Sequence, residues 1–507
     1  MTGADADVAV VGYGPVGMTL AILVAQRGHS VVVAERQPAS YLLPRAVHFD
    51  HEVARILQSA GLGSALPGMT EPVDEYEWRN GEGTTLLRLG RAGASASGWP
   101  ESLMFHQPSL EALLDRRARS LGVDVRRGLD VTGLTWDPDC VTLSGANGET
   151  VRARYAVGCD GANSTVRKLA GLPVQDLGFF YDWLIVDVTL HEPRVFQPVN
   201  VQICDPARPT TVVSGGPGQR RWEFMRLEHE TLEGLNSAAR AWELLEPWGV
   251  RPGNATLVRH AVYTFNARYA EQWRAGRVLL AGDAAHQMPP FAGQGLCAGI
   301  RDAANLAWKL DLILTGGAPD QLLDTYDTER LPSARQAIEL SMELGKVICV
   351  PDPAEAAERD KAMSILVGPE PAEVPPLPGI QTGIIDACSP HAGKLFVQGN
   401  VAGGGLFDDV HGAGWRLVTV DSERVALDPE TSRWFASIGG RLVAVPADDP
   451  VYCRWFTHHN CTAALQRPDF HLFGTAAGPA DAAGLLNRLR TRLSSTVTPE
   501  GSASEAR

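Results

Sequence analysis

The chain has 507 residues, of which 44% are hydrophobic and 21% charged, a composition typical of a soluble globular protein with two or three domains. It carries 45 basic and 59 acidic residues, a net charge of −14, which argues against nucleic acid or an anionic membrane as its main partner. None of the eight cysteines forms a C-x-x-C pair or lies at zinc-ligand spacing, so we expect no metal, free thiols and a cytoplasmic location.

The first 36 residues predict one β-α-β unit. An apolar strand over 8–11 leads into a helix over 15–27, and a second strand follows over 30–34. The connecting turn reads Gly12-Tyr13-Gly14-Pro15-Val16-Gly17, a spacing that lets backbone approach a pyrophosphate. Glu35 ends the second strand, where an acid can bind a ribose hydroxyl. The unit predicts dinucleotide binding and does not by itself separate NAD from FAD.

Between residues 107 and 265 the pattern changes twice. A helix over 107–126 running into a strand is followed by β-hairpins over 129–157. Strands with Gly-Pro turns then occupy 183–265, with one helix near 230–247, and predict an antiparallel sheet inserted into the nucleotide-binding domain. Asp160-Gly161 follows the last hairpin strand, and on its own this pair is most often a simple turn.

A strand–loop–helix segment then returns the chain to its first domain. An apolar strand over 278–281 precedes Gly282-Asp283, a Pro289-Pro290 bend, Gly293-Gln294-Gly295 and a helix over 296–314 with one apolar stripe. The Asp283 carboxylate can accept hydrogen bonds from a polyol, and free N–H groups at the helix start can stabilise negative charge. A flavin offers both, in its ribityl chain and its reduced ring. The alternative is a plain crossover with a capping aspartate.

The C-terminal third predicts a linker and a further domain. Helices continue to about residue 350, and the proline-rich segment 351–392 has the composition of a linker. A third region follows over 393–495, and residues 496–507 form a tail that we expect to be disordered. The strands of this region are expected at 415–420, 441–445 and 462–465, and its helices near 450–459 and 479–493.

Three of these motifs together resemble those of a known enzyme family. G-x-G-x-x-G, then Asp-Gly, then Gly-Asp, in this order and at these separations, are typical of flavoprotein aromatic hydroxylases (class A) related to p-hydroxybenzoate hydroxylase. The chain resembles 3-(3-hydroxyphenyl)propionate hydroxylases most, over nearly its whole length. Further segments that carry this similarity are 43–56, 106–108, 220–225, 262–268, 393–398 and 467–469.

The resemblance implies a fold of mixed class, α/β and α+β. A Rossmann-like FAD-binding domain would take residues 1–182 and 262–350, with an inserted antiparallel-sheet substrate domain over 183–261. The third region, 393–495, resembles a thioredoxin-like domain. Because it lacks C-x-x-C, it should not exchange thiols, and a structural or homodimer-forming role is expected.

The resemblance also implies which residues bind FAD. Cys297 stands where such enzymes commonly have Asn. Hydrogen bonds from the backbone N–H groups to the flavin would survive this change, whereas a contact through the Asn side chain would be lost. No second G-x-G-x-x-G is present, so NADPH or NADH is implied to bind transiently. The implied FAD-binding residues are Gly12, Gly14, Pro15, Val16, Gly17, Glu35 and Arg36 around the ADP half, Arg45 and Gln107 near the pyrophosphate and ribityl chain, Asp160 and Gly161, and Asp283, Pro290, Gly293, Gln294, Gly295, Leu296 and Cys297 around the ribityl chain and ring.

The implied activity is that of an FAD-dependent monooxygenase. NAD(P)H reduces the flavin, O2 adds at its C4a position, and the distal oxygen of the hydroperoxide moves to a phenol carbon. A phenylpropanoid-type phenol is the expected substrate, and the group that deprotonates it stays open. Candidate catalytic residues are Arg221, His48 and Pro290, and candidate pocket residues are Tyr181, Trp222 and Tyr263.

Two alternatives to this activity stay open. The same cofactor motifs would serve a tailoring oxygenase that hydroxylates a polycyclic aromatic or inserts oxygen beside a ketone. A non-catalytic flavin-binding redox sensor would keep the glycines and lose NAD(P)H oxidation. In each case His286, beside the flavin loop, is expected to pack or to form hydrogen bonds behind that loop.

Overall fold

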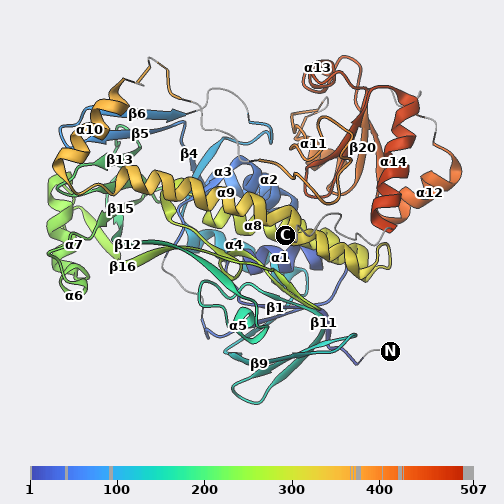
Figure 1. Ribbon diagram of the computed structural model, residues 1–507, viewed down its shortest axis with the longest axis horizontal. Coiled ribbons are helices and arrows are strands. Elements are labelled where there is room, and N and C mark those ends of the chain that lie inside the picture. Colours follow the sequence, from blue (N-terminus) through green and yellow to red (C-terminus); the bar gives the residue numbers. More distant parts are fainter. Residues whose placement is uncertain are drawn as a thin grey trace, which may run out of the picture.

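The computed structural model describes residues 3–39, 44–90, 95–365, 367–368, 370–372, 378–401, 404–420, 425 and 427–494. The tail predicted over 496–507 lies outside the described residues. Within the described part of the chain, no helix combines the length and apolar character needed to cross a membrane. Figure 1 shows two large sheets with helices packed against them, and a separate C-terminal part beside the N-terminal helices.

The first sheet is built on the predicted strand–helix–strand unit. β1 (Ala6–Val11) pairs in parallel with β2 (Val31–Glu35) and β11 (Thr150–Gly158), because apolar strands buried on both faces favour parallel pairing. Helix α1 (Pro15–Ala25) packs between α4 (Gln107–Ser120) and α8 (Gly295–Leu314) against this sheet (Figure 1). The other strands of the sheet are β8 (Asp124–Arg127), β9 (Val131–Trp136), β10 (Val141–Gly145), β17 (Arg274–Ala275) and β18 (Val278–Leu280).

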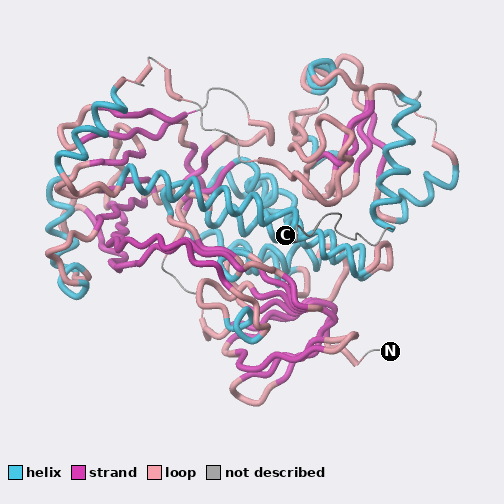
Figure 2. The backbone as a smooth tube through the Cα atoms, viewed as in Figure 1, coloured by secondary structure: helices cyan, strands magenta, loops and turns pink. Residues whose placement is uncertain are grey.

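The second sheet contains the predicted antiparallel strands and three short strands that the sequence did not predict, two between residues 75 and 90 and one at 286–287. Its order is β19-β16-β12-β15-β14-β13-β5-β6. The two longest strands extend toward the first sheet, as the continuous strand segments in Figure 2 show. β5 pairs in parallel with β13, so a segment more than a hundred residues upstream completes the sheet. The strands are β5 (Glu75–Asn80), β6 (Thr85–Gly90), β12 (Val174–Leu190), β13 (Asn200–Cys204), β14 (Thr210–Ser214), β15 (Gln219–Met225), β16 (Ala255–Ala270) and β19 (His286–Gln287).

The two faces of this second sheet are covered differently. Leu184, Val186 and Trp222 pack on one face against α6 (Leu232–Leu235) and α7 (Ala238–Leu245), in one apolar cluster. Trp78 and Trp183 lie in a different cluster, with Ile338 and Ile348 of α9 (Asp324–Ile348). Side chains alternate between the two faces along a strand. The sequence neighbours of Leu184, Val186 and Trp222 therefore point toward the second face, where a cavity lies.

The C-terminal part forms its own four-stranded sheet, in the order β21-β20-β22-β23. β20 and β21 are parallel, and the other two pairs are antiparallel. The predicted strands and helices are present, and β23, α11 and α12 were not predicted. The elements are α11 (Phe407–His411), β20 (Arg416–Thr419), α12 (Pro429–Ser437), β21 (Arg441–Ala444), α13 (Tyr452–His458), β22 (Ala463–Gln466), β23 (Leu472–Ala476) and α14 (Pro479–Ser494).

Shorter elements connect these parts. α10 (Pro353–Ser364) lies within the segment expected to be a linker, and Asp352 caps its N-terminus. A small sheet, β3-β7-β4, lies between the large sheets and the C-terminal part. The remaining elements are β3 (His48–Asp50), α2 (His51–Leu57), η1 (Gln58–Leu62), η2 (Gly63–Ala65), α3 (Leu66–Met69), β4 (Thr70–Pro72), β7 (Ser102–Phe105), α5 (Thr165–Leu169), η3 (Glu246–Trp248), η4 (Gly282–Ala284), η5 (Pro290–Ala292) and η6 (Asp320–Leu323).

Candidate active site

A cavity of about 1470 Å³ extends from the first sheet to the second. It is larger than the ~300–1,000 Å³ typical of sites for a single drug-sized ligand. Its lining comes from the β1–α1 turn, from β3, from the start of α4, from residues 281–296 and from the second sheet. The cavity therefore joins the cofactor segments predicted from the sequence to the inserted sheet.

The glycine turn 12–17 has the geometry of a phosphate cradle. Gly12 has φ +99°, and a Cβ there would lie 2.4 Å from the Cys159 carbonyl oxygen, so only glycine fits. A Cβ on Gly17 would lie 2.2 Å from the Gly12 carbonyl oxygen, whereas one on Gly14 would meet nothing within 4 Å. Gly14 faces the cavity at the N-terminus of α1, where free N–H groups can bind an anion.

Two carboxylates flank this turn, and each already has backbone partners. Glu35 Oε2 accepts the Tyr13 N–H at 2.8 Å and Oε1 accepts the Gln37 N–H at 2.7 Å, which leaves further lone pairs for ribose hydroxyls. Asp160 accepts the Thr165 and Val166 N–H groups of the first turn of α5, at 2.7 and 3.0 Å. Glu35, Arg36, Asp160 and Gly161 all line the cavity.

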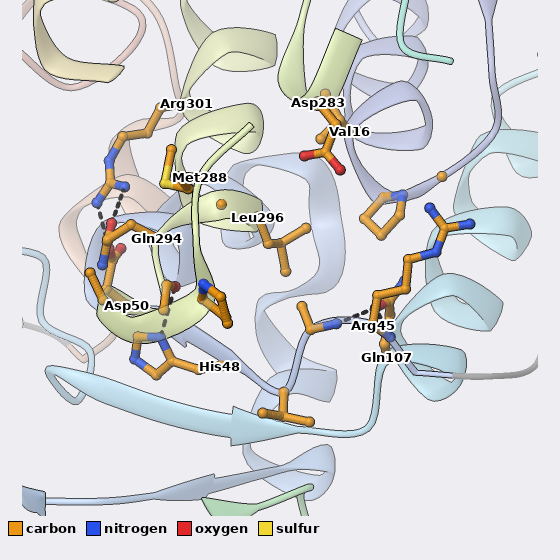
Figure 3. Close-up of a pocket in the computed structure, with 18 of the residues that line it drawn as sticks. Val16, Arg45, His48, Asp50, Gln107, Asp283, Met288, Gln294, Leu296 and Arg301 are labelled. Carbon is orange, nitrogen blue, oxygen red and sulfur yellow. Dashed lines mark hydrogen bonds and ion pairs between the residues drawn. The ribbon is translucent and has the colours of Figure 1, made fainter. Parts of the chain in front are cut away.

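The segment at Arg45 is held from two sides. Gln107 Oε1 accepts the N–H groups of Arg45 and Ala46, at 2.8 and 2.7 Å (Figure 3). Arg221 donates to the Pro44 and Arg45 carbonyl oxygens at 2.8 and 2.6 Å, and to Asp187 Oδ1 at 2.7 Å. Arg221 was expected to approach flavin and substrate. Arg221 does line the cavity. Its guanidinium, however, is hydrogen-bonded to Asp187 and to the carbonyl oxygens of Pro44 and Arg45.

The Gly282–Leu296 segment forms one side of the cavity. Asp283 is exposed into the cavity, and its surroundings raise the pKa of the carboxyl through desolvation, against the opposing charges of His286 and Arg45. Pro290 begins a short turn that ends at Gly293, which has φ +63°. In Figure 3, Leu296 at the start of α8 lies between Asp283 on one side and His48 on the other. Pro290, Gly293, Gln294 and Gly295 also line the cavity.

His48 and Cys297 both contact the Gly293 carbonyl. His48 Nδ1 lies 3.3 Å from this oxygen, and burial lowers the pKa of the imidazole. Cys297 Sγ lies 3.7 Å from it, within the first turn of α8, where burial raises the pKa of the thiol. The Cys297 side chain is buried and does not line the cavity, so at this position only backbone N–H groups are available.

The predicted pocket aromatics divide between the two faces of the second sheet. Tyr263 lines the cavity. Trp222 does not: it is fully buried on the opposite face, with ring centroids 6.0 Å from Phe196 and 6.2 Å from Trp248. The expectation for Trp222 is therefore corrected, because alternation along β15 gives the cavity to its neighbours. Tyr181 packs edge-on against Phe179 at 5.2 Å and is also absent from the cavity lining.

Several polar residues of the cavity wall were not singled out from the sequence. Gln202, Thr211 and Glu223 lie on β13, β14 and β15, and Tyr76 lies on β5. An alternating pattern on β15 could have indicated Glu223, but the contribution of β5 depends on long-range pairing. Asp302, on α8 behind the loop, was missed as well. His286 forms a hydrogen bond behind the loop, as expected, and Asp302 is its partner.

These features fit the demands of FAD. The turn at Gly14 is open where a pyrophosphate needs backbone N–H groups, and Glu35 stands beside it for a ribose. No described group donates a hydrogen bond to Asp283, so its carboxyl is available to a polyol. The α8 N-terminus presents the unpaired N–H groups of a first helical turn to the cavity.

Comparisons with known proteins agree with this site. Residues 5–341 match a family described as FAD binding domain. A probable NADH-specific resorcinol 4-hydroxylase of Rhodococcus jostii is 41% identical over 508 residues, covering 95% of this chain and 94% of the relative. A 3-(3-hydroxy-phenyl)propionate/3-hydroxycinnamic acid hydroxylase of a Mycobacterium species is 35% identical, covering 92% and 88%.

The same relationship holds for solved structures. The anhydrotetracycline hydroxylase OxyS from Streptomyces rimosus superimposes with a TM-score of 0.75 at 28% identity, over 96% of this chain and 99% of that chain. The cavity geometry, the family match and the full-length relatives all indicate the same class. The chain belongs to the FAD-dependent aromatic hydroxylases, a family of flavoprotein monooxygenases.

Proposed function

We propose that this enzyme hydroxylates a small phenol with a resorcinol-type ring, using NADH. The observation that carries the proposal is a cavity that joins the proposed FAD segments to a polar wall of the second sheet. The 41% identity with a probable NADH-specific resorcinol 4-hydroxylase supports both the substrate class and the choice of nicotinamide. Hydroxyphenylpropionate is the second candidate, supported by relatives at 35% identity.

We assign the FAD-binding roles by position in the cavity. The glycine turn and Glu35 would hold the ADP half, and Arg45 would lie near the pyrophosphate. Asp283 would accept hydrogen bonds from the ribityl chain, and the α8 N-terminus would stabilise negative charge at the pyrimidine edge of the ring. When bound, FAD supplies the reaction with dioxygen, and the protein positions the phenol and excludes water.

The remaining candidate residues receive supporting roles. Arg221 is a positioning residue in this proposal, because its donors hold the Pro44–Arg45 backbone. His48 would fix the Gly293 turn through its contact with the carbonyl oxygen, and Pro290 would shape the wall above the ring. These roles do not require any of the three to exchange a proton with substrate.

For the C-terminal part we propose a thioredoxin-like fold with a structural role. Its strand order β21-β20-β22-β23, with one parallel and two antiparallel pairs and a helix after each of the first two strands, supports this. We also propose the domain boundaries expected from the sequence. Residues 1–182 and 262–350 form the FAD-binding domain, 183–261 the substrate domain, 351–392 a linker and 393–495 the C-terminal domain. Without C-x-x-C, thiol exchange is not part of it.

One experiment tests the proposed function. The purified protein is assayed for bound FAD, then for NADH and NADPH consumption with resorcinol, with 3-(3-hydroxyphenyl)propionate and with a polycyclic phenol. We expect resorcinol to stimulate NADH consumption and to yield a product with one added oxygen. Stimulation by the polycyclic phenol alone would instead favour a tailoring oxygenase.

A further inference from the structure

Three polar side chains cross the cavity face of the second sheet in one row. Glu223 on β15 is paired with Thr211 on β14, and Thr211 is paired with Gln202 on β13. The neighbours that continue the row, Ile185 and Trp78, are apolar. A polar row in the wall of an enclosed cavity costs desolvation unless each group finds a partner.

Two members of this row satisfy each other. Thr211 Oγ1 donates to Gln202 Oε1 at 2.6 Å, and Gln202 Nε2 donates to the Thr210 carbonyl oxygen at 3.1 Å. The Tyr76 hydroxyl lies 3.4 Å from the same Gln202 oxygen. These contacts fix three hydroxyl or amide groups beside Glu223. We call Tyr76, Gln202, Thr211 and Glu223 the hydroxyl site.

Among the described residues, none donates a hydrogen bond to Glu223, in contrast to Gln202. Glu223 is 7% exposed and lines the cavity. Its ion pair with Arg221 Nη1 is 3.7 Å long, beyond hydrogen-bond distance. Burial raises the pKa of this carboxyl, although the charge of Arg221 opposes the effect. A ligand that donates a hydrogen bond to this carboxylate would remove the cost of burying it without a donor.

The charges around the hydroxyl site disfavour a second carboxylate. Arg221 Nε lies 2.7 Å from Asp187 Oδ1, and Arg259 Nε lies 3.5 Å from Asp187 Oδ2. Arg221 and Arg259, the cationic residues that the described second sheet contributes to the cavity lining, therefore both form ion pairs with Asp187. Arg221 also forms the longer ion pair with Glu223. A ring carrying a propionate chain would bring its negative charge toward Glu223, where like charges repel.

We propose that Glu223 accepts a hydrogen bond from a phenolic hydroxyl of the substrate, and that the hydroxyl site selects an uncharged dihydroxybenzene over a phenol with a carboxylate side chain. This inference rests on the proposed function and names the substrate class within it. The second ring hydroxyl would reach the Thr211 or Tyr76 hydroxyl, which lie on the adjoining strands. Glu223 is then the residue that determines specificity.

The test compares Glu223→Gln with the matched control Glu243→Gln. Glu243 lies on α7, which covers the opposite face of the same sheet, and its side chain is 64% exposed in an ion pair with Arg240. For parent, variant and control holoenzymes, kcat/KM is measured with resorcinol and with 3-(3-hydroxyphenyl)propionate. Binding of resorcinol is measured separately by calorimetry without NADH.

We expect Glu223→Gln to lower kcat/KM for resorcinol about ten- to hundredfold, the loss expected for a hydrogen bond to a charged group. Resorcinol affinity should fall in parallel, and kcat/KM for the carboxylate substrate should stay constant or rise. Glu223→Asp should restore part of the preference, and Glu243→Gln should match the parent. If Glu223→Gln does not fold, Thr211→Val gives the same test with a loss of about threefold to tenfold.

Two results would overturn the inference. Equal losses on both substrates would mean that Glu223 does not select between them, and a Glu223→Gln variant indistinguishable from Glu243→Gln would mean that it does not contact the ring. Both results leave the proposed function intact. A parent holoenzyme that turns over neither phenol would overturn the proposed function, and the inference with it.

Discussion

His286 Nε2 lies 2.6 Å from Asp302 Oδ2, and both side chains are fully buried behind the loop that bears Asp283. The same carboxylate accepts the Gly282 N–H at 3.1 Å and pairs with Arg330 Nε at 2.9 Å. Burial alone would raise the pKa of Asp302, but the charges of His286 and Arg330 outweigh it and hold this pKa below its usual value. Asp302 on α8 thus holds the Gly282–Leu296 segment, through Gly282 and His286, and α9, through Arg330.

The first prediction concerns this buried pair. Asp302→Asn should lower the free energy of unfolding by about 3 kcal/mol, because it leaves the buried Arg330 guanidinium without its counter-charge. Asp311→Asn is the control: Asp311 lies on the same helix, 2.7 Å from His29, but is 28% exposed, and its loss should cost less than about 1 kcal/mol. Urea unfolding of both apo-variants measures this. Equal effects would contradict the role given to Asp302.

A second prediction separates the two kinds of glycine in the phosphate turn. Gly14→Ala should fold like the parent, since Gly14 has φ −85° and its Cβ would meet no protein atom within 4 Å. Its FAD affinity should fall about tenfold, or about 1.4 kcal/mol, because the new methyl group enters the cofactor space. Gly12→Ala should instead lose more than about 1 kcal/mol of apo-protein stability. FAD titration and thermal unfolding report the two effects, and an unchanged affinity in Gly14→Ala would argue against a pyrophosphate at this turn.

The third prediction follows from the raised pKa of Glu223. Burial favours its neutral form, so its folded-state pKa lies above the unfolded value, and its contribution to stability is complete below pH 4.5 and decreases as pH rises above that value. The groups that face it are Arg221, Asp187, Arg259 and Tyr76. Glu223→Gln does not titrate, so its stability relative to the parent should increase as pH rises above 4.5, while it loses activity on resorcinol. A stability difference between variant and parent that does not change with pH would contradict this account.

A fourth prediction concerns the buried ion pairs that connect α9 to the C-terminal part. Glu329 on α9 lies 2.6 Å from Arg467 Nη2 and 2.9 Å from Lys309 Nζ, all fully buried. Burial would raise the pKa of Glu329, but these two cations prevail and lower it to about 2 from 4.5. Its stabilisation is therefore complete above pH 4.5 and is lost as pH falls toward 2. Glu329→Gln should cost on the order of 3 kcal/mol at pH 7 and much less at pH 3.

Substitution of the exposed residue Glu339 provides the control for Glu329→Gln. It lies on the same helix with a side chain 61% exposed, 3.9 Å from Arg335. Glu339→Gln should leave stability unchanged within about 0.5 kcal/mol at both pH values. Urea unfolding at pH 7 and pH 3 supplies the measurement, and a pH-independent difference between parent and Glu329→Gln would refute the assignment.

Local sequence patterns were sufficient to single out three segments that meet at one end of the cavity. The glycine turn, the Glu35 strand end and the Gly282–Leu296 segment each depend on neighbours within about twenty residues, so spacing and apolar periodicity were sufficient. All three segments line one cavity in the structure.

The part of the cavity wall on the second sheet depends on contacts that no local pattern contains. β5 joins the second sheet by pairing with β13, which places Tyr76 in the wall through long-range register alone. The assignment of Trp222 failed for a related reason. The sequence showed that Trp222 is an aromatic residue on a strand, but not which face of the sheet it occupies. Because side chains alternate, Trp222 points away from the cavity that Arg221 and Glu223 line. The family resemblance did not specify this face.

The central claim is that the cavity holds FAD beside a phenol and that dioxygen supplies the new hydroxyl. The most direct measurement is the mass of the product formed from resorcinol and NADH by the purified holoenzyme under isotopically heavy dioxygen. The account predicts a trihydroxybenzene that carries one heavy oxygen atom, with the amount formed rising with the NADH consumed. NADH consumption that resorcinol does not stimulate, or a product without the heavy atom, would contradict it.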